Sequence, residues 1–323
     1  MLVLSEDELR RAVAAADAEA LKRVEDAFAA LASGNARVPP PMALDVPERQ
    51  GEVHIKSAHL ADPPSMVVKI AAGFYRNPDL GLPTSSGLMI LMSAETGAVQ
   101  AVLLDNGYLT EVRTGLAGAL AAKYAAPRQI ETVGVIGVGS QARYQLRALQ
   151  LVRKPQRVLV YGRRPDAAQA YAREMSEELG LDVSTRPNAE LVVRECQLLI
   201  TTTTARRPVV NEEWVHDGMH ITAVGSDGPE KQELEPAILG RADHVICDLV
   251  SQAARLGELH HALEGGLVTT EDPVELGQLI LLGKSVRTKD DELTVCDLTG
   301  VGVQDAAIAA YAVERAIATR QTT

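Results

Sequence analysis

The sequence predicts an α/β protein: a doubly wound parallel sheet of the Rossmann type beside a smaller α+β domain. Between residues 132 and 248, short apolar segments alternate with helical ones, which is typical of parallel strands joined by crossover helices. Between residues 51 and 104, apolar residues alternate with period two between turn residues, which indicates antiparallel strands. The length of 323 residues is sufficient for two hydrophobic cores.

Three further segments have helical spacing. Residues 1–35 begin with a capping-box pattern at Ser5 and Glu8, and apolar residues then recur every three or four positions. Residues 110–126 predict a helix that ends before a proline, and residues 301–320 predict a last helix that could return to the first domain. The predicted domains are therefore residues 1–125 plus 302–323, and residues 126–301 for the Rossmann domain.

Composition narrows the classes of function. The net charge of −11 argues against nucleic-acid binding, which requires clustered Lys and Arg. Cys196, Cys247 and Cys296 lie in apolar segments without partners at metal-ligand or redox spacing, so we expect buried free thiols. No apolar run reaches the roughly 18 residues of a membrane span, and the acidic, amphipathic start is not a signal peptide. We expect a cytoplasmic protein with no metal, nucleic-acid or membrane partner.

A glycine-rich turn predicts a dinucleotide site. The strand at residues 133–136 is followed by G-x-G-x-x-A, with Gly137, Gly139 and Ala142 in the fixed positions, and then by a helix. The first glycine permits the tight turn, the second lets the backbone approach a pyrophosphate, and the alanine lets the helix pack closely. Free amides at the helix start, at Ser140 and Gln141, would bind the phosphates. A glycine-rich turn without a ligand is the alternative.

The end of the next strand favours one nucleotide. NAD enzymes normally place an acidic residue about 20 residues after the motif, on the ribose 2′-hydroxyl. Here the strand ends at Tyr161 and continues with Gly162, Arg163 and Arg164, and the first carboxylate is Asp166. Two guanidiniums would bind a 2′-phosphate, so NADP(H) is favoured and NAD(H) stays possible. The alternative is that both arginines are solvated surface residues.

Several segments together resemble the ornithine cyclodeaminase/μ-crystallin family along nearly the whole chain. They are MVVKI at Lys69, LDNGYLTEVRTGLAG at Arg113, VIGVGSQA, AVGSDGPEKQEL at Asp227 and Lys231, and TVCDLTGVGVQD near the end. The resemblance implies a homodimer whose N-terminal domain binds substrate and provides the dimer contacts. It also implies hydride transfer between nicotinamide and the α-carbon of a small amino or imino acid.

The resemblance assigns roles to individual residues. Arg113 matches the substrate-carboxylate arginine, and Lys69 a second cationic ligand that also takes part in catalysis. Asp227 matches the acid/base residue and follows a strand end, where open α/β sheets place ligands. The alternatives are an ordinary surface ion pair for Lys69 and Arg113 and a structural turn carboxylate for Asp227. We also expect Lys56 and Thr84 at the substrate, and Thr202, Val224 and Lys231 at the cofactor; a solvated role is the alternative for Lys231.

Two departures from the family bear on substrate. Lys56 stands where cyclodeaminases carry an acidic residue suited to a distal ammonium, and Gly162 with Arg163 replaces their NAD-binding aspartate. The chain nevertheless has Asp227, which μ-crystallin-like ketimine reductases often lack. We therefore expect an NADP(H)-dependent imine reductase or amino-acid dehydrogenase. The alternatives are a cyclodeaminase that recycles bound NAD and a non-catalytic binding protein.

Overall fold

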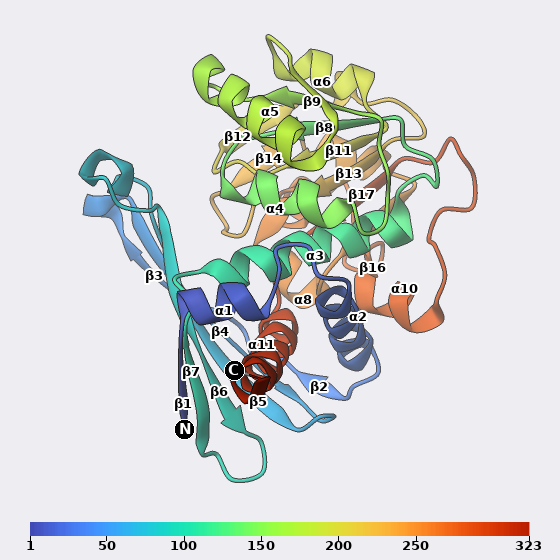
Figure 1. The fold of residues 1–323 in the computed structure, drawn as a ribbon. Coiled ribbons are helices and arrows are strands. Elements are labelled where there is room, and N and C mark those ends of the chain that lie inside the picture. The colour runs from blue at the N-terminus through green and yellow to red at the C-terminus, as the bar shows by residue number, and fades with distance from the viewer. Residues whose placement is uncertain (323) are drawn as a thin grey trace. The chain divides into compact units, whose positions relative to one another are not determined.

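The computed structural model describes residues 1–322, which form two compact units (Figure 1). Unit 1 contains residues 1–114 and the chain from residue 301 onward, and unit 2 contains residues 115–300. The first boundary lies within helix α3 (Tyr108–Ala125), and not at the end of that helix, where the sequence suggested it.

Unit 1 is a seven-stranded mixed sheet with helices. Its strands run in the order β1-β7-β6-β5-β4-β2, and β3 also pairs with β4. All pairs are antiparallel except β1 with β7. The strands are β1 (Leu2–Ser5), β2 (Ala36–Arg37), β3 (Met42–Val46), β4 (Gly51–Leu60), β5 (Ser65–Phe74), β6 (Ser85–Ser93) and β7 (Val99–Leu104). The helices are α1 (Glu6–Ala12), α2 (Ala18–Ala32) and α11 (Gly302–Thr322).

Helix α11 confirms the predicted return of the last helix, since it packs on β4, β5 and β6 and against α2. Side chains that alternate along the strands are buried on one face, among them Ala58, Val67, Lys69 and Met89. Gly302 permits the close approach of α11, because a Cβ there would lie 2.3 Å from the carbonyl oxygen of Ser57.

The prediction of a continuous helix over residues 1–35 is wrong in part. The capping box at Ser5 and Glu8 is confirmed, with Ser5 as the N-cap of α1. Residues 2–5, however, form strand β1, which pairs in parallel with β7, and the helix is interrupted between Ala12 and Ala18. Strand pairing with a distant segment overrides the local helical spacing, which is a tertiary effect.

Unit 2 is the predicted parallel sheet, with eight strands in the order β10-β9-β8-β11-β13-β17-β15-β16. The strands are β8 (Thr132–Ile136), β9 (Arg157–Tyr161), β10 (Asp182–Thr185), β11 (Leu198–Thr201), β13 (His220–Ala223), β15 (His244–Cys247), β16 (Val274–Glu275) and β17 (Thr294–Asp297). A separate pair joins β12 (Arg206–Val210) to β14 (Gln232–Leu234). The helices are α4 (Ser140–Leu149), α5 (Pro165–Leu179), α6 (Ala189–Glu195), α7 (Ala237–Arg241), α8 (Val250–Ala253), α9 (Gly257–Glu264) and α10 (Leu276–Leu282).

The strand order of unit 2 reverses at β8. From β8 the chain proceeds outward to β9 and β10, and then returns to add β11 and β13 on the other side. Such a reversal leaves a crevice outside the carboxyl ends of the strands, where α/β sheets bind ligands. The relevant ends are Ile136 of β8, Tyr161 of β9 and Thr201 of β11.

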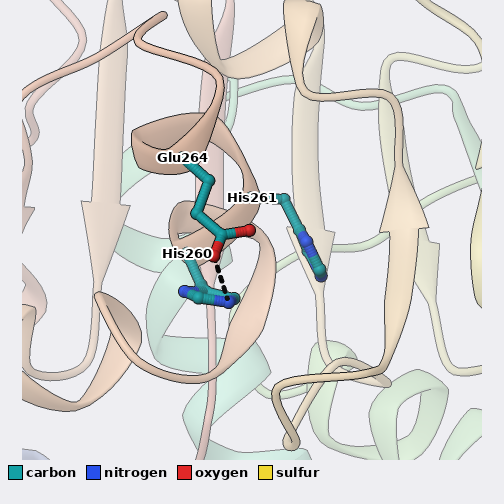
Figure 2. Close-up of side chains that lie close together, drawn as sticks. All are labelled: His260, His261 and Glu264. Carbon is teal, nitrogen blue, oxygen red and sulfur yellow. Dashed lines mark ion pairs between the residues drawn. The ribbon is translucent and has the colours of Figure 1, made fainter.

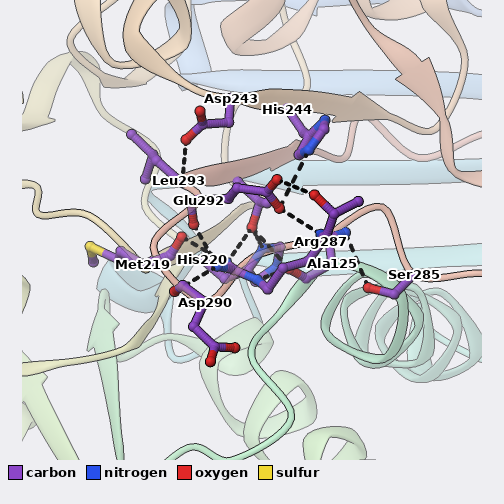
Figure 3. A network of polar contacts seen from close by, with 12 residues as sticks. Ala125, Met219, His220, Asp243, His244, Ser285, Arg287, Asp290, Glu292 and Leu293 are labelled. Carbon is purple, nitrogen blue, oxygen red and sulfur yellow. Dashed lines mark hydrogen bonds and ion pairs between the residues drawn. The ribbon is translucent and has the colours of Figure 1, made fainter.

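The opposite, amino edge of this sheet is held by a polar network (Figure 3). The Arg287 guanidinium donates to the carbonyl oxygens of Ala125 and Met219 at 3.2 Å each and to Thr294 Oγ1 at 3.1 Å. His220 Nδ1 is 2.8 Å from Thr294 Oγ1. Burial and the charge of Arg287 lower the pKa of His220 to about 3, so the imidazole is neutral. The network ties α3 to β13 and β17, and we interpret this edge as structural.

The three cysteines are buried free thiols, as the sequence predicted. Among the described residues, no helix combines the length and apolar character needed to cross a membrane.

Candidate functional site

The loop between β8 and α4 fits the phosphates of a dinucleotide. Gly137 has φ +101°, and a Cβ there would lie 2.8 Å from the Thr202 carbonyl oxygen, so glycine is required at this turn. At Gly139 a Cβ would meet no atom within 4 Å, which means that the space above the loop is open. No side chain caps the first turn of α4, which begins at Ser140. Its amides are therefore available to an anion.

The residues after Gly139 contribute different contacts to the loop. Ser140 is exposed at the helix start, whereas Ala142 is fully buried and allows close packing. Gln141 Oε1 accepts a hydrogen bond from Gln145 Nε2 at 3.3 Å. Arg143, which the sequence analysis missed, donates to the carbonyl oxygens of both Val138 and Gly139 at 2.9 Å. The sequence does show a basic residue early in this helix, but its hydrogen-bond partners depend on the backbone conformation of the turn before it.

The threonines after β11 divide into different roles. Thr201 is buried, and its hydroxyl donates to Glu233 Oε2 at 2.8 Å, so it is structural. Thr203 accepts a hydrogen bond from the backbone of Ala205, within its own loop. Thr202 Oγ1 is buried beside Gly137 and has no hydrogen-bond partner among residues 1–322. An unsatisfied buried hydroxyl needs a partner, and a bound dinucleotide would supply one.

The end of β9 carries the two arginines. Gly162 packs against the loop, since a Cβ there would lie 2.8 Å from Val138 Cγ2. Arg163 and Arg164 are exposed, and neither makes an ion pair within the described chain. Pro165 begins α5 directly after them. Both guanidiniums are therefore available for an anionic ligand.

The loop after β13 holds Asp227 and Lys231. Lys231 Nζ lies 2.7 Å from Asp227 Oδ1, and the side chains are 9% and 39% exposed, respectively. Ser226 Oγ donates to the Lys231 carbonyl oxygen at 2.6 Å and closes the loop. A solvated role for Lys231 is thus contradicted: its ammonium pairs with Asp227. Val224, also expected at the cofactor, is buried, and its amide donates to the Thr201 carbonyl oxygen at 3.0 Å.

Unit 1 gathers Lys69 and Arg113 around one buried carboxylate. Lys69 Nζ lies 3.0 Å from each oxygen of Asp305, and Arg113 Nε lies 2.9 Å from Asp305 Oδ1. Arg113 Nη1 donates to Gln304 Oε1 at 2.7 Å. Lys69, Arg113 and Asp305 are 1%, 4% and 0% exposed. An ordinary surface ion pair is therefore contradicted for Lys69 and Arg113.

Buried charges of both signs surround Lys69. Lys56 is buried and stands directly opposite Lys69 in the β4–β5 ladder. Burial, Arg113 and Lys56 lower the pKa of Lys69 and Asp305 raises it, which leaves this pKa at about 7. Lys69 and Arg113 are two buried cations that share the single carboxylate of Asp305, and a buried charge is costly unless an opposite charge compensates it. The cluster is therefore suited to a carboxylate ligand.

Asp305 and Gln304 were missed as site residues. They are adjacent polar residues in the first turn of α11, a helix otherwise rich in small apolar residues. That contrast was a usable signal, although the partners come from segments almost 200 and more residues away.

Thr84 is not brought to this cluster. Its carbonyl oxygen accepts from the Phe74 amide at 2.8 Å, at the end of the β5–β6 hairpin. The residue opposite Lys69 is Met89, five positions along β6. At about 3.4 Å per strand residue, Thr84 is roughly 17 Å from that position. Strand length, which sequence reasoning did not fix, separates them.

A third group, on α9, consists of His260, His261 and Glu264, which could contribute metal ligands (Figure 2). His260 Nε2 lies 3.6 Å from Glu264 Oε1, as residues four apart on a helix allow. His261, at the adjacent position, faces a different direction, and its Nε2 is 2.8 Å from the Lys231 carbonyl oxygen. Proximity of the three side chains alone does not indicate a metal, so we assign none to this group.

Comparisons with known proteins identify the family of the chain. The family model described as "Ornithine cyclodeaminase/mu-crystallin family" matches residues 3–320. An uncharacterized cyclodeaminase of Sinorhizobium fredii is 44% identical over 318 residues, 98% of this chain and 96% of that protein.

Two solved structures are similar over 99% of this chain. One is an archaeal alanine dehydrogenase dimer with bound NAD, at 39% identity, 97% coverage of that chain and a TM-score of 0.91. The other is a Thermococcus litoralis Δ1-pyrroline-2-carboxylate reductase in complex with NADH and L-proline, at 30% identity, 98% coverage and a TM-score of 0.93. On this evidence, the chain belongs to the ornithine cyclodeaminase/mu-crystallin family.

Proposed function

We propose that this protein is an NADP(H)-dependent imine reductase or amino-acid dehydrogenase that acts on a small α-imino or α-amino acid. The observation that carries the proposal is the buried cluster in which Lys69 and Arg113 share the carboxylate of Asp305. The relatives named as alanine dehydrogenase and pyrroline-carboxylate reductase act on substrates that carry a carboxylate beside the reacting carbon.

Each polar group has a role suited to its chemistry. Arg113 and Lys69 bind the substrate carboxylate, Arg113 through its planar fork. Asp305 and Gln304 orient these two side chains. Asp227 exchanges a proton with the substrate nitrogen or with water, and Lys231 holds it in place. Bound nicotinamide would supply or accept the hydride at the α-carbon. Lys56 favours a substrate with a neutral or acidic side chain over a diamino acid.

The preference for NADP(H) is supported by the end of β9. Glycine at position 162 provides no carboxylate for a ribose hydroxyl, while Arg163 and Arg164 are exposed and without ion pairs in residues 1–322. Guanidiniums form charge-assisted hydrogen bonds with phosphate.

Arg163→Asp should shift the cofactor preference towards NAD(H). The substitution removes a phosphate ligand and places a negative charge against the 2′-phosphate, while the new carboxylate can accept from a ribose hydroxyl. Hydrogen bonds to charged groups are worth about 1.5–3 kcal/mol, so the ratio of Kd values for NADPH and NADH should change by roughly 10- to 100-fold. Fluorescence titration measures both constants. Arg173→Asp, an exposed residue on α5, is the matched control. An unchanged ratio in R163D would show that Arg163 only faces solvent.

Substrate affinity should depend on pH through Lys69. The ammonium form binds a carboxylate and is present below the pKa of about 7; a bound carboxylate raises that pKa. The KM should therefore rise as the pH increases from about one unit below to about two units above this value. Lys69→Arg keeps the charge throughout, so its KM should be flatter with pH. A wild-type KM that does not change over this range would contradict the role of Lys69.

One assay separates the proposed reactions. A panel of 2-oxo acids with amines, and of amino acids, is supplied with NADPH and NADH in parallel, and the absorbance of the reduced cofactor is followed. We expect stoichiometric consumption of NADPH with a small 2-oxo acid and an amine. Ammonia release from ornithine or lysine without net cofactor change would identify a cyclodeaminase instead. Tight NADPH binding without turnover of any substrate would identify a binding protein.

We further propose that the protein is a homodimer formed through the sheet of unit 1. The sheet face opposite α11 carries half-exposed apolar side chains on neighbouring strands, namely Ile55, Met66, Val68, Ile70, Leu88, Ile90, Met92 and Val102. A contiguous apolar patch of this kind marks an interaction surface. The similar alanine dehydrogenase is a dimer, and in this proposal a second copy of the chain covers the face.

A further inference from the structure

Glu233 is a fully buried carboxylate that the proposed chemistry does not use. It lies in strand β14 and is 0% exposed. Its Oε2 accepts from Thr201 Oγ1 and from the Gly225 amide, both at 2.8 Å, and its Oε1 accepts from the Thr203 amide at 2.5 Å. Burial raises its pKa, and these donors lower it. These three hydrogen bonds hold the buried carboxyl group in one orientation.

These donors belong to two different loops. Thr201 and Thr203 flank Thr202 at the end of β11, and Gly225 begins the loop that continues to Asp227 after β13. Strands β11 and β13 are adjacent and parallel, so both loops leave the same edge of the sheet. The loops are in close contact, because a Cβ at Gly225 would lie 2.1 Å from the Thr203 carbonyl oxygen. Glu233 therefore sets the spacing between the loop with the unsatisfied Thr202 hydroxyl and the loop with Asp227.

A second buried carboxylate fixes Glu233 itself. Glu258 is 1% exposed, and it accepts from the Glu233 amide at 2.7 Å and from the Leu234 amide at 3.1 Å. Glu258 thus holds the backbone of β14, and the Glu233 side chain extends from this strand to the two loops. Such an arrangement is rigid because each carboxylate oxygen is occupied by a donor from the protein.

We propose that Glu233 is a positioning residue that presents the β11 and β13 loops to the dinucleotide and so determines cofactor affinity. The proposal rests on the dinucleotide binding of the proposed function. Glu233 acts through Thr202 and Gly225 and is not itself a catalytic residue.

Glu233→Gln tests the proposal because glutamine has the same shape. Its single oxygen is best placed at the Oε2 position, where two donors meet, and its amide NH2 then opposes the Thr203 amide. The β11 loop should lose the bond from the Thr203 amide, while the bonds from Thr201 Oγ1 and the Gly225 amide are kept. We expect the Kd for NADPH to rise about tenfold or more. Amide hydrogen exchange should accelerate at residues 202–205 more than at residues 225–231.

The control is Glu235→Gln. Glu235 accepts from the Glu212 amide at 2.8 Å and its side chain makes no hydrogen bond to either loop within residues 1–322, so this variant should retain wild-type affinity and exchange. NADPH and NADH are titrated in parallel into both variants and the wild type, together with thermal unfolding. A lower unfolding midpoint in E233Q with unchanged Kd values would overturn the positioning role and leave the proposed function intact. A wild type that binds neither dinucleotide would overturn both.

A second variant keeps the test decisive if E233Q does not fold. Glu258→Gln retains the Glu233 carboxylate and weakens only the support behind it, through the Glu233 and Leu234 amides. Cofactor affinity should fall in the same direction by a smaller factor. An E258Q protein that is folded and binds both nucleotides as tightly as the wild type would contradict the positioning role of Glu233.

Discussion

Replacing Asp227 by asparagine should lower turnover by about 10²- to 10⁴-fold and leave cofactor affinity unchanged, because general acid–base catalysis contributes about this much. Asparagine retains the shape, and its amide oxygen can still accept from Lys231 Nζ, which lies 2.7 Å from the present carboxylate. What the variant loses is a group that can accept and return a proton. The kcat from NADPH consumption and the Kd from fluorescence titration together measure this separation.

The control for Asp227→Asn is Glu230→Gln. Glu230 is in the same loop, its side chain is 70% exposed and its partner is Arg206, so the variant makes the same change of charge without touching Asp227. We expect wild-type turnover from it. If D227N keeps more than about a tenth of wild-type kcat, Asp227 is a structural carboxylate of the turn, contrary to the assignment.

Replacing Arg113 by lysine should raise the KM for the substrate carboxylate by roughly 10- to 100-fold, with cofactor affinity unchanged. The positive charge stays, but the planar fork that can hold a carboxylate with two parallel hydrogen bonds is lost. The bond from Nη1 to Gln304 at 2.7 Å and the contact of Nε with Asp305 at 2.9 Å are lost as well. Hydrogen bonds to charged groups are worth about 1.5–3 kcal/mol, which is the source of the expected factor.

Arg23→Lys provides the comparison for this variant. Arg23 lies in unit 1, its side chain is 37% exposed, and it pairs with Glu314, so the same replacement there should leave KM unaltered. Initial rates over a range of substrate concentrations, with thermal unfolding as a check on folding, distinguish the two. An R113K enzyme with the wild-type KM would exclude Arg113 as a carboxylate ligand.

The glycine loop between β8 and α4 could be predicted because its determinants are local. Gly137 and Gly139 are required by the path of a few consecutive residues, and the strand before and the helix after them follow from periodicity. Arg163 and Arg164 follow directly from the next strand. The structure adds the unsatisfied Thr202 hydroxyl, which no pattern in the sequence distinguishes from the threonines on either side.

The cluster of Lys69, Arg113 and Asp305 could be predicted only in part. The family resemblance pointed to Lys69 and Arg113, yet it gave no indication that one carboxylate at position 305 holds both. The packing of β4, β5, α3 and α11 decides the burial of these residues, the position of Lys56 opposite Lys69 in the strand register, and the Lys69 pKa of about 7. Thr84 lies away from the expected substrate position for the same reason, since the length of the β5–β6 hairpin decides its distance from Lys69.

The sequence alone was sufficient to predict the alternating order of strands and helices in unit 2, the glycine loop and the pair of arginines, because each depends on residues close together in the chain. The structure was needed to show that residues 2–5 form a strand, that Lys231 pairs with Asp227, and that Glu233 joins two loops. These features depend on side chains that become neighbours when distant segments pack together, and burial then fixes their charges and hydrogen-bond partners.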